Sequence, residues 1–329
     1  MSITMRDVAR VAHVSVATVS HVVNDKPGAR IGDDARRRVL DAVAELGYRP
    51  NALAKTLSQG GSRFIGLVAD AIATTPFAGQ IIHGAQDEAW RHGYVLLVAN
   101  TEGNVAAEND AIAMMLEHQV RGILYSTWYH REIEVPPPLQ HTDTVLVNCY
   151  AANDAYPAVV PDEEQGGRTA TEELIAAGHR RIAFVNTTSP SPAQTGRLAG
   201  YASALEAAGF DYDASLVFEA ESAQEGGYAI TSAVIESGAS GVFCHNDRVA
   251  MGLYDGLRER GLRIPEDIAV MGFDNQDVIA AHLRPPLSTV ALPHYELGAA
   301  GVRTLLGLES VTKRDRLLVA CPSISRASL

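Results

Sequence analysis

Short apolar runs alternate with helical segments from residue 64 to residue 329, and few folds accept such a pattern. The apolar runs cover residues 64–68, 94–98, 122–125, 144–147, 181–185, 241–244 and 268–271. The helical segments cover residues 80–92, 107–118, 165–177, 196–208, 226–237 and 247–260. Continuous apolar strands separated by helices indicate parallel sheets that are covered on both faces. Because the strands form two series, the pattern predicts an α/β body of two doubly wound parallel-sheet lobes with a cleft between them.

The first 63 residues have a different pattern, which predicts three short helices. Thr4 and Asp7 form a capping-box pattern at the start of the first helix. His13 lies in the short turn that ends this helix, and Ser15 can cap a second helix that continues to about Asn24. A third helix follows, opened by two aspartates and ended by a glycine. Two short helices joined by such a turn and braced by a third have the geometry of an all-α helix-turn-helix head.

The distribution of charge allows a nucleic-acid partner for this head. The whole chain carries a net charge of −12, which by itself argues against DNA binding because phosphates repel negative charge. Residues 1–63, however, contain ten Lys and Arg against six Asp and Glu, whereas residues 64–329 contain seventeen against thirty-three. The head is therefore +4 and the body −16, so the electrostatic argument against DNA applies only to the body.

The head also carries a dense sequence signature. It consists of Met-Arg-Asp-Val-Ala-Arg at 5–10, Val-Ser-Val-Ala-Thr-Val-Ser-His-Val-Val-Asn at 14–24, Arg-Val-Leu at 38–40 and Glu-Leu-Gly-Tyr-Arg-Pro-Asn-Ala-Leu-Ala at 45–54. In these stretches the chain resembles the lactose/galactose-repressor (LacI/GalR) family of bacterial transcription regulators. One departure is His13, where the family often has Gly or Asn. Because His tolerates a left-handed backbone better than most residues, we expect the turn to form.

The resemblance implies that the second helix enters the major groove of DNA. Val16 and Ala17 fall where the family reads bases, and their small apolar side chains can contact thymine methyl groups. Thr18 and Ser20 are expected to hold phosphates near the positive end of the helix. His21 can donate to a base edge or a phosphate, or it can be an ordinary surface histidine. The head residues expected at DNA are Thr4, Ser15, Val16, Ala17, Thr18, Ser20, His21 and Asn24.

Residues 50–62 are expected to form a hinge helix and a flexible linker. Asn51 can cap a short helix, and the Gly-rich end that follows suits a joint. In the resembled family this helix folds on the operator, and a leucine from each protomer enters the minor groove. Leu57 matches that leucine, and Lys55 lies nearby. Leu53 and Leu57, four residues apart, can instead pack against each other locally.

The body resembles the effector domain of the same family, which is similar to periplasmic sugar-binding proteins. Ligands of doubly wound folds bind beyond the carboxyl ends of the strands. The resemblance places five residues against the effector: Arg197, Asn246 and Asp274 from the second lobe, and Phe77 and Asn148 from the first. Arg and Asp can grip adjacent hydroxyls in bidentate fashion, and an aromatic ring can cover the apolar face of a sugar. The set therefore suits a neutral polyol, most simply a carbohydrate.

Other roles stay open for several of these residues. Arg197 can form a surface salt bridge, Asp274 can cap a helix, and Phe77 can be a loop aromatic. Asp162 can be an effector ligand or a helix cap. Purine-binding members of the family carry further aromatic and basic residues, at positions where this chain has Pro76, Ser191, Ala193 and Ser222. A purine or nucleoside is therefore the weaker alternative to a sugar.

The chain lacks the sequence marks of the main enzyme and metal-binding classes. It has no GxSxG, HExxH or P-loop motif, and Cys149, Cys244 and Cys321 lie far apart without a CxxC. We therefore expect no enzyme activity, no cofactor and no metal. The N-terminal segment has no apolar core of the kind that signal peptides contain, and no run approaches the ~20 apolar residues of a membrane span. We expect a cytoplasmic protein with no membrane partner.

These observations predict three segments. Residues 1–49 are expected to form the helix-turn-helix DNA-binding domain, 50–62 the hinge helix and linker, and 63–329 the two-lobed effector-binding and dimerisation domain. The expected lobes are residues 63–160 plus 292–329 for lobe 1 and residues 161–291 for lobe 2. A homodimer would present two heads to near-palindromic double-stranded operator DNA, and a small effector would control that binding. The rival classes, a solute-binding protein or an enzyme on the same lobes, leave the basic head unexplained.

Overall fold

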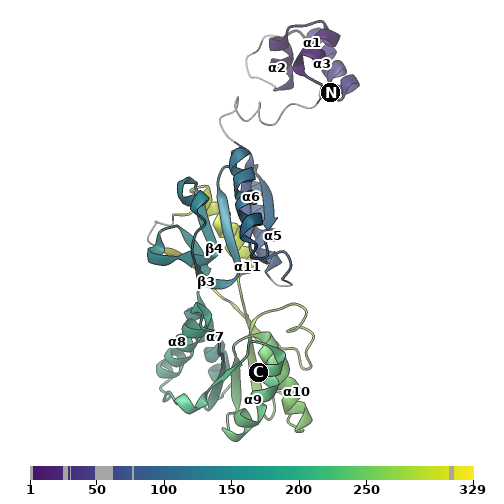
Figure 1. Cartoon of the computed structure of the whole chain (residues 1–329). Coiled ribbons are helices and arrows are strands. Elements are labelled where there is room, and N and C mark those ends of the chain that lie inside the picture. The colour runs from purple at the N-terminus through teal and green to yellow at the C-terminus, as the bar shows by residue number, and fades with distance from the viewer. Residues whose placement is uncertain (1–2, 25–28, 30, 49–61, 76–77, 311–314) are drawn as a thin grey trace. The chain divides into compact units, whose positions relative to one another are not determined.

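The chain folds as a small helical head and a body of two α/β lobes (Figure 1). The computed structural model describes residues 3–24, 29, 31–48, 62–75, 78–310 and 315–329. Among these residues, no helix is both long enough and apolar enough to cross a lipid bilayer.

The head is a three-helix unit. Its helices are α1 (Met5–Ala12), α2 (Val16–Val23) and α3 (Asp33–Leu46). The predicted capping box is confirmed, because the Thr4 side chain accepts from the amide of Asp7 and the Asp7 carboxylate accepts from the amide of Thr4 at 3.0 Å. His13 takes the left-handed conformation with a φ of 53°, so the turn between α1 and α2 forms as expected. The three helices enclose an apolar core that includes Val8, Val19, Val22, Val39 and Ala42.

The first lobe is built on a six-stranded parallel sheet of order β11-β5-β4-β3-β1-β2. Its strands are β1 (Phe64–Ala69), β2 (Val95–Asn100), β3 (Ile123–Ile133), β4 (Thr144–Ala151), β5 (Ala158–Pro161) and β11 (Arg316–Val319). Its helices are α5 (Gly79–Arg91), α6 (Val105–Glu117) and α11 (His294–Leu305), with 3₁₀ turns η1 (Pro137–His141) and η2 (Ala152–Asp154). Helices α5 and α11 share one core with the sheet through Ile81, Ala85 and Leu297. Met115 of α6 packs over Gly66 of β1.

The second lobe repeats this plan with the order β12-β10-β9-β8-β6-β7. Its strands are β6 (Ile182–Thr187), β7 (Val217–Ala220), β8 (Gly241–Cys244), β9 (Ala269–Asp274), β10 (Ser288–Ala291) and β12 (Ser323–Ile324). Its helices are α7 (Glu163–Ala176), α8 (Pro192–Ala207), α9 (Gln224–Glu236) and α10 (Asp247–Glu259), with the 3₁₀ turn η3 (Ala214–Leu216). One apolar core lies under α7 and α8 and another under α9 and α10, so both faces of the sheet are covered.

The predicted fold class is confirmed. Each of the seven apolar runs overlaps a strand, and each predicted helical segment overlaps a helix. The strands that the pattern missed, β5, β7, β10, β11 and β12, have two to four residues and so carry little periodicity. Helix α11 was also missed, since most of its residues are buried and several are Gly or Ala, which leaves only a narrow polar face around Glu296 and Arg303 to mark it.

The expected lobe boundary near the C-terminus is wrong. It assigns residues 292–329 to lobe 1, but β12 pairs antiparallel with β10 of the second sheet. Beyond it, the Ser328 hydroxyl donates to the carbonyl of Val270 at 2.6 Å and accepts from the amide of Ser288 at 2.8 Å. These bonds satisfy backbone groups at the start of the β9–β10 pairing. The chain therefore passes between the lobes three times, after β5, after β10 and after β11.

Candidate functional site

In the head, the N-terminus of α2 presents an exposed polar cap. The Ser15 hydroxyl accepts a hydrogen bond from the amide of Thr18 at 3.0 Å and lies 2.9 Å from the Thr18 hydroxyl. Ser15, Val16 and Ala17 are exposed, whereas Val19 of the same helix is buried in the head core. The helix is thus held from one side and presents its first turn on the surface. Helix N-termini of this kind attract phosphate groups.

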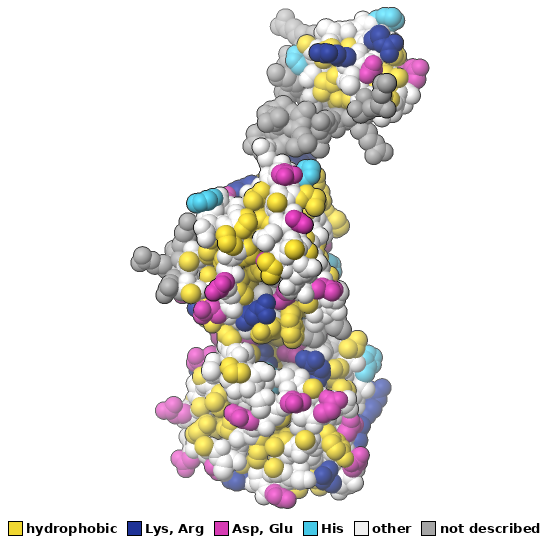
Figure 2. Space-filling model, viewed as in Figure 1, with side chains coloured by type: hydrophobic (Ala, Val, Ile, Leu, Met, Phe, Trp, Pro, Cys, Tyr) yellow, Lys and Arg dark blue, Asp and Glu magenta, His cyan; other side chains and the backbone are white. Residues whose placement is uncertain are grey.

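The remaining head residues expected at DNA have mixed surroundings. Four of them are half-buried: Thr18, Ser20, His21 and Asn24. The side-chain amide of Asn24 donates to the carbonyl of Ser20 at 2.9 Å and so closes the C-terminus of α2. Thr4 is exposed, and Figure 2 shows Arg side chains on the visible face of the head. The hinge residues Asn51, Lys55 and Leu57 lie outside the described residues.

In the body, a cavity of about 340 Å³ lies between the two lobes; we call it the interlobe cleft. Four of the five residues expected at the effector line it: Asn148, Arg197, Asn246 and Asp274. The fifth, Phe77, lies outside the described residues. The first lobe contributes a wall made of Trp128, Tyr129, His130 and Asn148. The second lobe contributes a polar wall that includes Thr187, Ser189, Ser191, Arg197, Ser222, His245, Asn246, Arg248 and Asp274.

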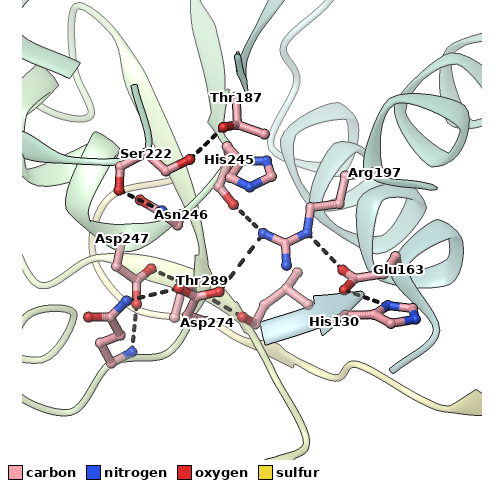
Figure 3. A network of polar contacts seen from close by, with 12 residues as sticks. His130, Glu163, Thr187, Arg197, Ser222, His245, Asn246, Asp247, Asp274 and Thr289 are labelled. Carbon is pink, nitrogen blue, oxygen red and sulfur yellow. Dashed lines mark hydrogen bonds and ion pairs between the residues drawn. The ribbon is translucent and has the colours of Figure 1, made fainter. Parts of the chain in front are cut away.

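Arg197 is the centre of the polar wall (Figure 3). Its side chain is 4% exposed, which excludes the surface salt bridge that the sequence left open. The guanidinium donates from Nε to Glu163 at 2.9 Å and from a terminal nitrogen to the carbonyl of His245, and it lies 3.9 Å from Asp274. It also stacks on the Phe273 ring, with 3.6 Å from its central carbon to the ring centroid. The geometry of Arg197 is therefore fixed by the protein before any ligand arrives.

Glu163 connects this arginine to the first lobe. Its second carboxylate oxygen lies 3.4 Å from Nδ1 of His130, which stands on β3. Glu163 can sit beside Arg197 because α7 and α8 pack at very short range. A Cβ added to Gly200 would lie 2.1 Å from the carbonyl oxygen of Glu164, and one added to Gly167 would lie 2.4 Å from the carbonyl oxygen of Arg197. Glycine is therefore required at this crossing for steric reasons.

Burial controls the protonation states in the cleft. Burial raises the pKa of the Glu163 carboxyl, but Arg197 and His130 outweigh this effect and bring that pKa down to about 2. Burial raises the pKa of Asp274 to about 6, although Arg197 opposes the shift. For histidines burial acts in the other direction and lowers the pKa of His294 to about 4 and that of His245 well below its usual range. At neutral pH, His245 and His294 are thus uncharged.

Two cleft residues, Asn148 and Asp274, and the neighbour of the second, Asn275, hold unusual backbone conformations. Asn148 at β4 has a φ of 58°, and Asp274 and Asn275 at the end of β9 have φ values of 102° and 52°. Such conformations are unfavourable for side chains other than glycine and tend to gather at functional sites. The Asn148 side chain donates to the carbonyl of Thr127 at 3.0 Å, and Asp274 accepts from the side chain of Gln276 at 2.8 Å. Asp274 is thereby oriented at the end of β9, as the fold predicts for ligand contacts, and Asn148 is oriented within β4.

Residues 4–51 match the family described as "Bacterial regulatory proteins, lacI family", and residues 171–329 match the "Periplasmic binding protein-like domain". The ribose operon repressor of Haemophilus influenzae is 33% identical to this chain, over 97% of the chain and 96% of its own length. The chain belongs to the LacI family of bacterial regulatory proteins. It is therefore a DNA-binding transcriptional regulator, as the head signature indicated.

Two further comparisons extend the match across the whole LacI-family chain. The HTH-type transcriptional repressor PurR of Photobacterium profundum is 32% identical, over 92% of this chain and 91% of its own length. A solved structure of the lac repressor dimer bound to operator and the anti-inducer ONPF superposes with a TM-score of 0.79 and 26% identity. It covers 100% of this chain and 99% of its own. Head and body together are thus those of a LacI-family regulator.

The structure shows which of two residues of this LacI-family chain caps a helix. Asp162 is a helix cap, because its carboxylate accepts from the amide of Gln165 at 2.9 Å at the start of α7. Asp274 caps none of the described helices; the cap of α10 is Asn246, which accepts from the amide of Val249 at 2.9 Å. Asn246 therefore both caps α10 and lines the interlobe cleft.

Several cleft residues were missed by sequence reasoning. Glu163 stands in a run of three acidic residues that resembles an ordinary helix start. His245 directly precedes Asn246 at the end of a predicted strand, so the strand-end rule could have found it. Trp128, Tyr129 and His130 follow the third predicted strand, but their direction depends on an irregularity in β3 that no sequence period reveals.

Proposed function

We propose that this regulator is a repressor whose affinity for operator DNA is controlled by a neutral sugar bound in the interlobe cleft. The observation that carries the proposal is the composition of the cleft. Hydroxyl and amide side chains line it, and its two arginines, Arg197 and Arg248, are balanced by two carboxylates, Glu163 and Asp274. A pocket of about 340 Å³ with convergent polar groups and no excess charge suits an uncharged polyol.

A purine is the second candidate, because a PurR repressor is among the relatives. Purine recognition calls for aromatic and basic side chains around a flat heterocycle. Ser191, Ala193 and Ser222 line the cleft of this chain, and the family resemblance implies aromatic and basic residues at these positions in purine-binding members. The substitutions favour the sugar, and a binding comparison between the two ligand classes decides the question.

For DNA, we propose that two protomers pair through their bodies and present two heads to a near-palindromic operator. The α2 helices would occupy successive major grooves, with Thr4, Ser15, Val16, Ala17, Thr18, Ser20, His21 and Asn24 at the interface. Hinge helices carrying Asn51, Lys55 and Leu57 would occupy the central minor groove, where the leucine wedges between bases and bends the duplex. The sugar would bind one lobe arrangement better and so shift the population of heads able to dock. Such a protein works in the cytoplasm beside the chromosome and needs no catalytic activity.

The test uses the purified full-length chain. DNA that binds it is selected from a random duplex pool, and the selected site is labelled for anisotropy. We expect affinity to fall steeply with salt, since log K drops by ~0.9 for each phosphate neutralised. A neutral sugar should then change operator affinity, whereas hypoxanthine should not. An effect of hypoxanthine without any effect of sugars would reverse the assignment.

The hinge assignment has its own test on the same complex. Leu57→Ala should weaken operator binding and reduce DNA bending, measured by energy transfer between dyes at the duplex ends, while sugar binding stays at the parent level. Unchanged bending would contradict the wedge.

A further inference from the structure

Strand β3 contains an irregularity that faces the interlobe cleft. Ser126 pairs with Val147 of β4, and the next paired residue, Arg131, faces Cys149. Four residues of β3, 127–130, therefore stand opposite the single residue Asn148. This bulge turns Trp128, Tyr129 and His130 onto the cleft wall of the first lobe. Bulges often re-aim side chains beside functional sites.

The bulge is held in place from several sides. The Thr127 hydroxyl lies 2.8 Å from the carbonyl of Tyr129 and 3.0 Å from that of Asn148, and the Asn148 side chain donates back to the carbonyl of Thr127. Asp70, at the end of β1, accepts from the amide of Trp128 and from the Arg131 guanidinium, each at 3.0 Å. Groups fixed in this way before ligand binding lose little conformational entropy when a ligand arrives.

The side chains of the bulge form an aromatic surface. The rings of Trp128 and Tyr129 meet edge-to-face, with 4.7 Å between their centroids. Arg131 lies over the Tyr129 ring at 4.8 Å and donates to its hydroxyl at 3.2 Å, which fixes the ring orientation. Tyr129 is 38% exposed, although large aromatic side chains are usually buried. The bulge therefore offers ring surface to the cleft, facing a polar wall of hydroxyls, amides and charges.

We propose that the Trp128 ring, held edge-to-face by Tyr129, is the platform against which the ring of a pyranose sugar stacks. The C–H groups on one face of a pyranose are apolar and carry slightly positive hydrogens, which match the negative face of an aromatic ring. The hydroxyls at the ring edge then reach the polar wall around Arg197 and Asp274. This inference rests on the proposed sugar effector and narrows it to a neutral cyclic sugar. An open-chain polyol carries the same hydroxyls but has no flat apolar face, so it should bind poorly.

The chain offers a direct reporter for this contact, since it contains two tryptophans. Trp90 lies on α5 and is 62% exposed. In the full-length Trp90→Phe variant, Trp128 is the only source of tryptophan emission. The probes are D-glucose, D-galactose, D-xylose, cellobiose and lactose, with sorbitol and galactitol as open-chain controls and hypoxanthine as the purine control. Binding is measured by calorimetry and by emission.

We expect at least one pyranose to bind and to shift Trp128 emission in the Trp90→Phe protein, and the open-chain polyols to cause neither effect. Trp128→Ala should weaken binding of that sugar by about tenfold or more, and Trp128→Phe by much less, because a ring remains. Trp90→Ala, which removes an exposed ring of the same kind, should bind like the parent. The thermal midpoint of each unliganded variant checks that it folds.

The possible outcomes distinguish a failure of the aromatic platform from a failure of the proposed sugar effector. If a pyranose binds but Trp128→Ala keeps the parent affinity, or if the open-chain polyols bind equally well, the platform is overturned and the sugar effector stands. If no sugar binds, or if only hypoxanthine binds, the proposal of a sugar effector is overturned. The proposal of an aromatic platform is then overturned as well.

Discussion

The two walls of the interlobe cleft differ in chemistry and in construction. The wall of the second lobe is polar and grows from regular strand ends and helix starts, with Arg197 bound to Glu163 at its centre (Figure 3). The wall of the first lobe is aromatic and grows from a bulge that presents Trp128 and Tyr129. In the second lobe, regular strands and helices position charged side chains beside fixed partners. In the first lobe, the irregular segment of β3 positions aromatic rings. The comparison predicts that breaking the buried Arg197–Glu163 pair of the polar wall affects both folding and binding, whereas substitution of the exposed Tyr129 in the aromatic wall affects binding with little effect on folding.

The largest effect should come from Arg197→Ala. It leaves the buried Glu163 carboxylate without its main partner, and breaking a buried pair in this way costs about 3–5 kcal/mol. Urea unfolding of the body, followed by circular dichroism, measures the loss. The matched control is Arg168→Ala on α7, whose pair with Glu164 is exposed and should matter by well under 1 kcal/mol. Equal losses of unfolding free energy in the two variants would contradict the stabilising role of the buried Arg197–Glu163 pair.

Gly200→Ala tests the close crossing of α7 and α8 that supports the polar wall. The added methyl group would meet the Glu164 carbonyl at 2.1 Å, so the helices must separate at a cost of about 1–3 kcal/mol. Gly79→Ala is the control, because a Cβ there meets nothing within 4 Å. The same unfolding assay applies, and a variant as stable as Gly79→Ala would show that the crossing is not tight.

His294, buried beside Glu163 and Arg197 at the start of α11, gives the next effect. Burial lowers its pKa to about 4, so between about pH 6.5 and pH 4 the unfolded chain takes up a proton that the folded chain does not. This contribution to stability is present above pH 6.5 and is lost as the pH falls. On going from pH 7.5 to pH 5, the parent should lose about 2 kcal/mol more than His294→Gln. Parallel stability curves for the two proteins would contradict the assignment.

The smallest effect on folding should come from Asp274→Asn. Burial raises the pKa of this carboxyl to about 6, which means that its ionised form is unfavourable in the folded protein and costs stability as the pH rises from about 4 through 6. Removing the charge should leave the unfolding free energy at pH 7 unchanged or slightly higher, while binding of the sugar is lost. A destabilisation as large as that of Arg197→Ala would mean that Asp274 serves the fold rather than the ligand.

The sequence predicted one wall far better than the other, for a physical reason. Arg197, Asn246 and Asp274 belong to a polar wall whose residues follow strands or open helices, and the carboxyl edge of a parallel sheet gathers such residues wherever they stand in the chain. Trp128 and Tyr129 depend on a change of register in β3, which arises from pairing with β4 and leaves no mark on hydrophobic periodicity. Glu163 was missed because its role depends on how closely α7 approaches α8.

The head and the C-terminal segment of the body differ in the same way in how well the sequence predicts them. The capping box at Thr4 and the left-handed turn at His13 are local, so neighbouring residues specify them. The return of residues 323–329 to the second lobe depends on long-range contacts, since β12 pairs with β10 and Ser328 bonds to β9. Local capping can be predicted from a few residues, but the pairing of a two-residue strand cannot.

A sugar held against Asp274 is proposed to control how tightly the heads bind DNA. The most direct measurement is operator anisotropy with the full-length parent and with Asp274→Asn, each titrated with DNA at zero and at saturating sugar. Binding linkage requires the two ligands to be coupled through the protein, typically by 5–150-fold in affinity. For the parent we expect saturating sugar to shift operator affinity by about tenfold or more. For Asp274→Asn we expect the parent's affinity for DNA and no shift with sugar. An equal shift in both proteins would contradict the proposed control through Asp274.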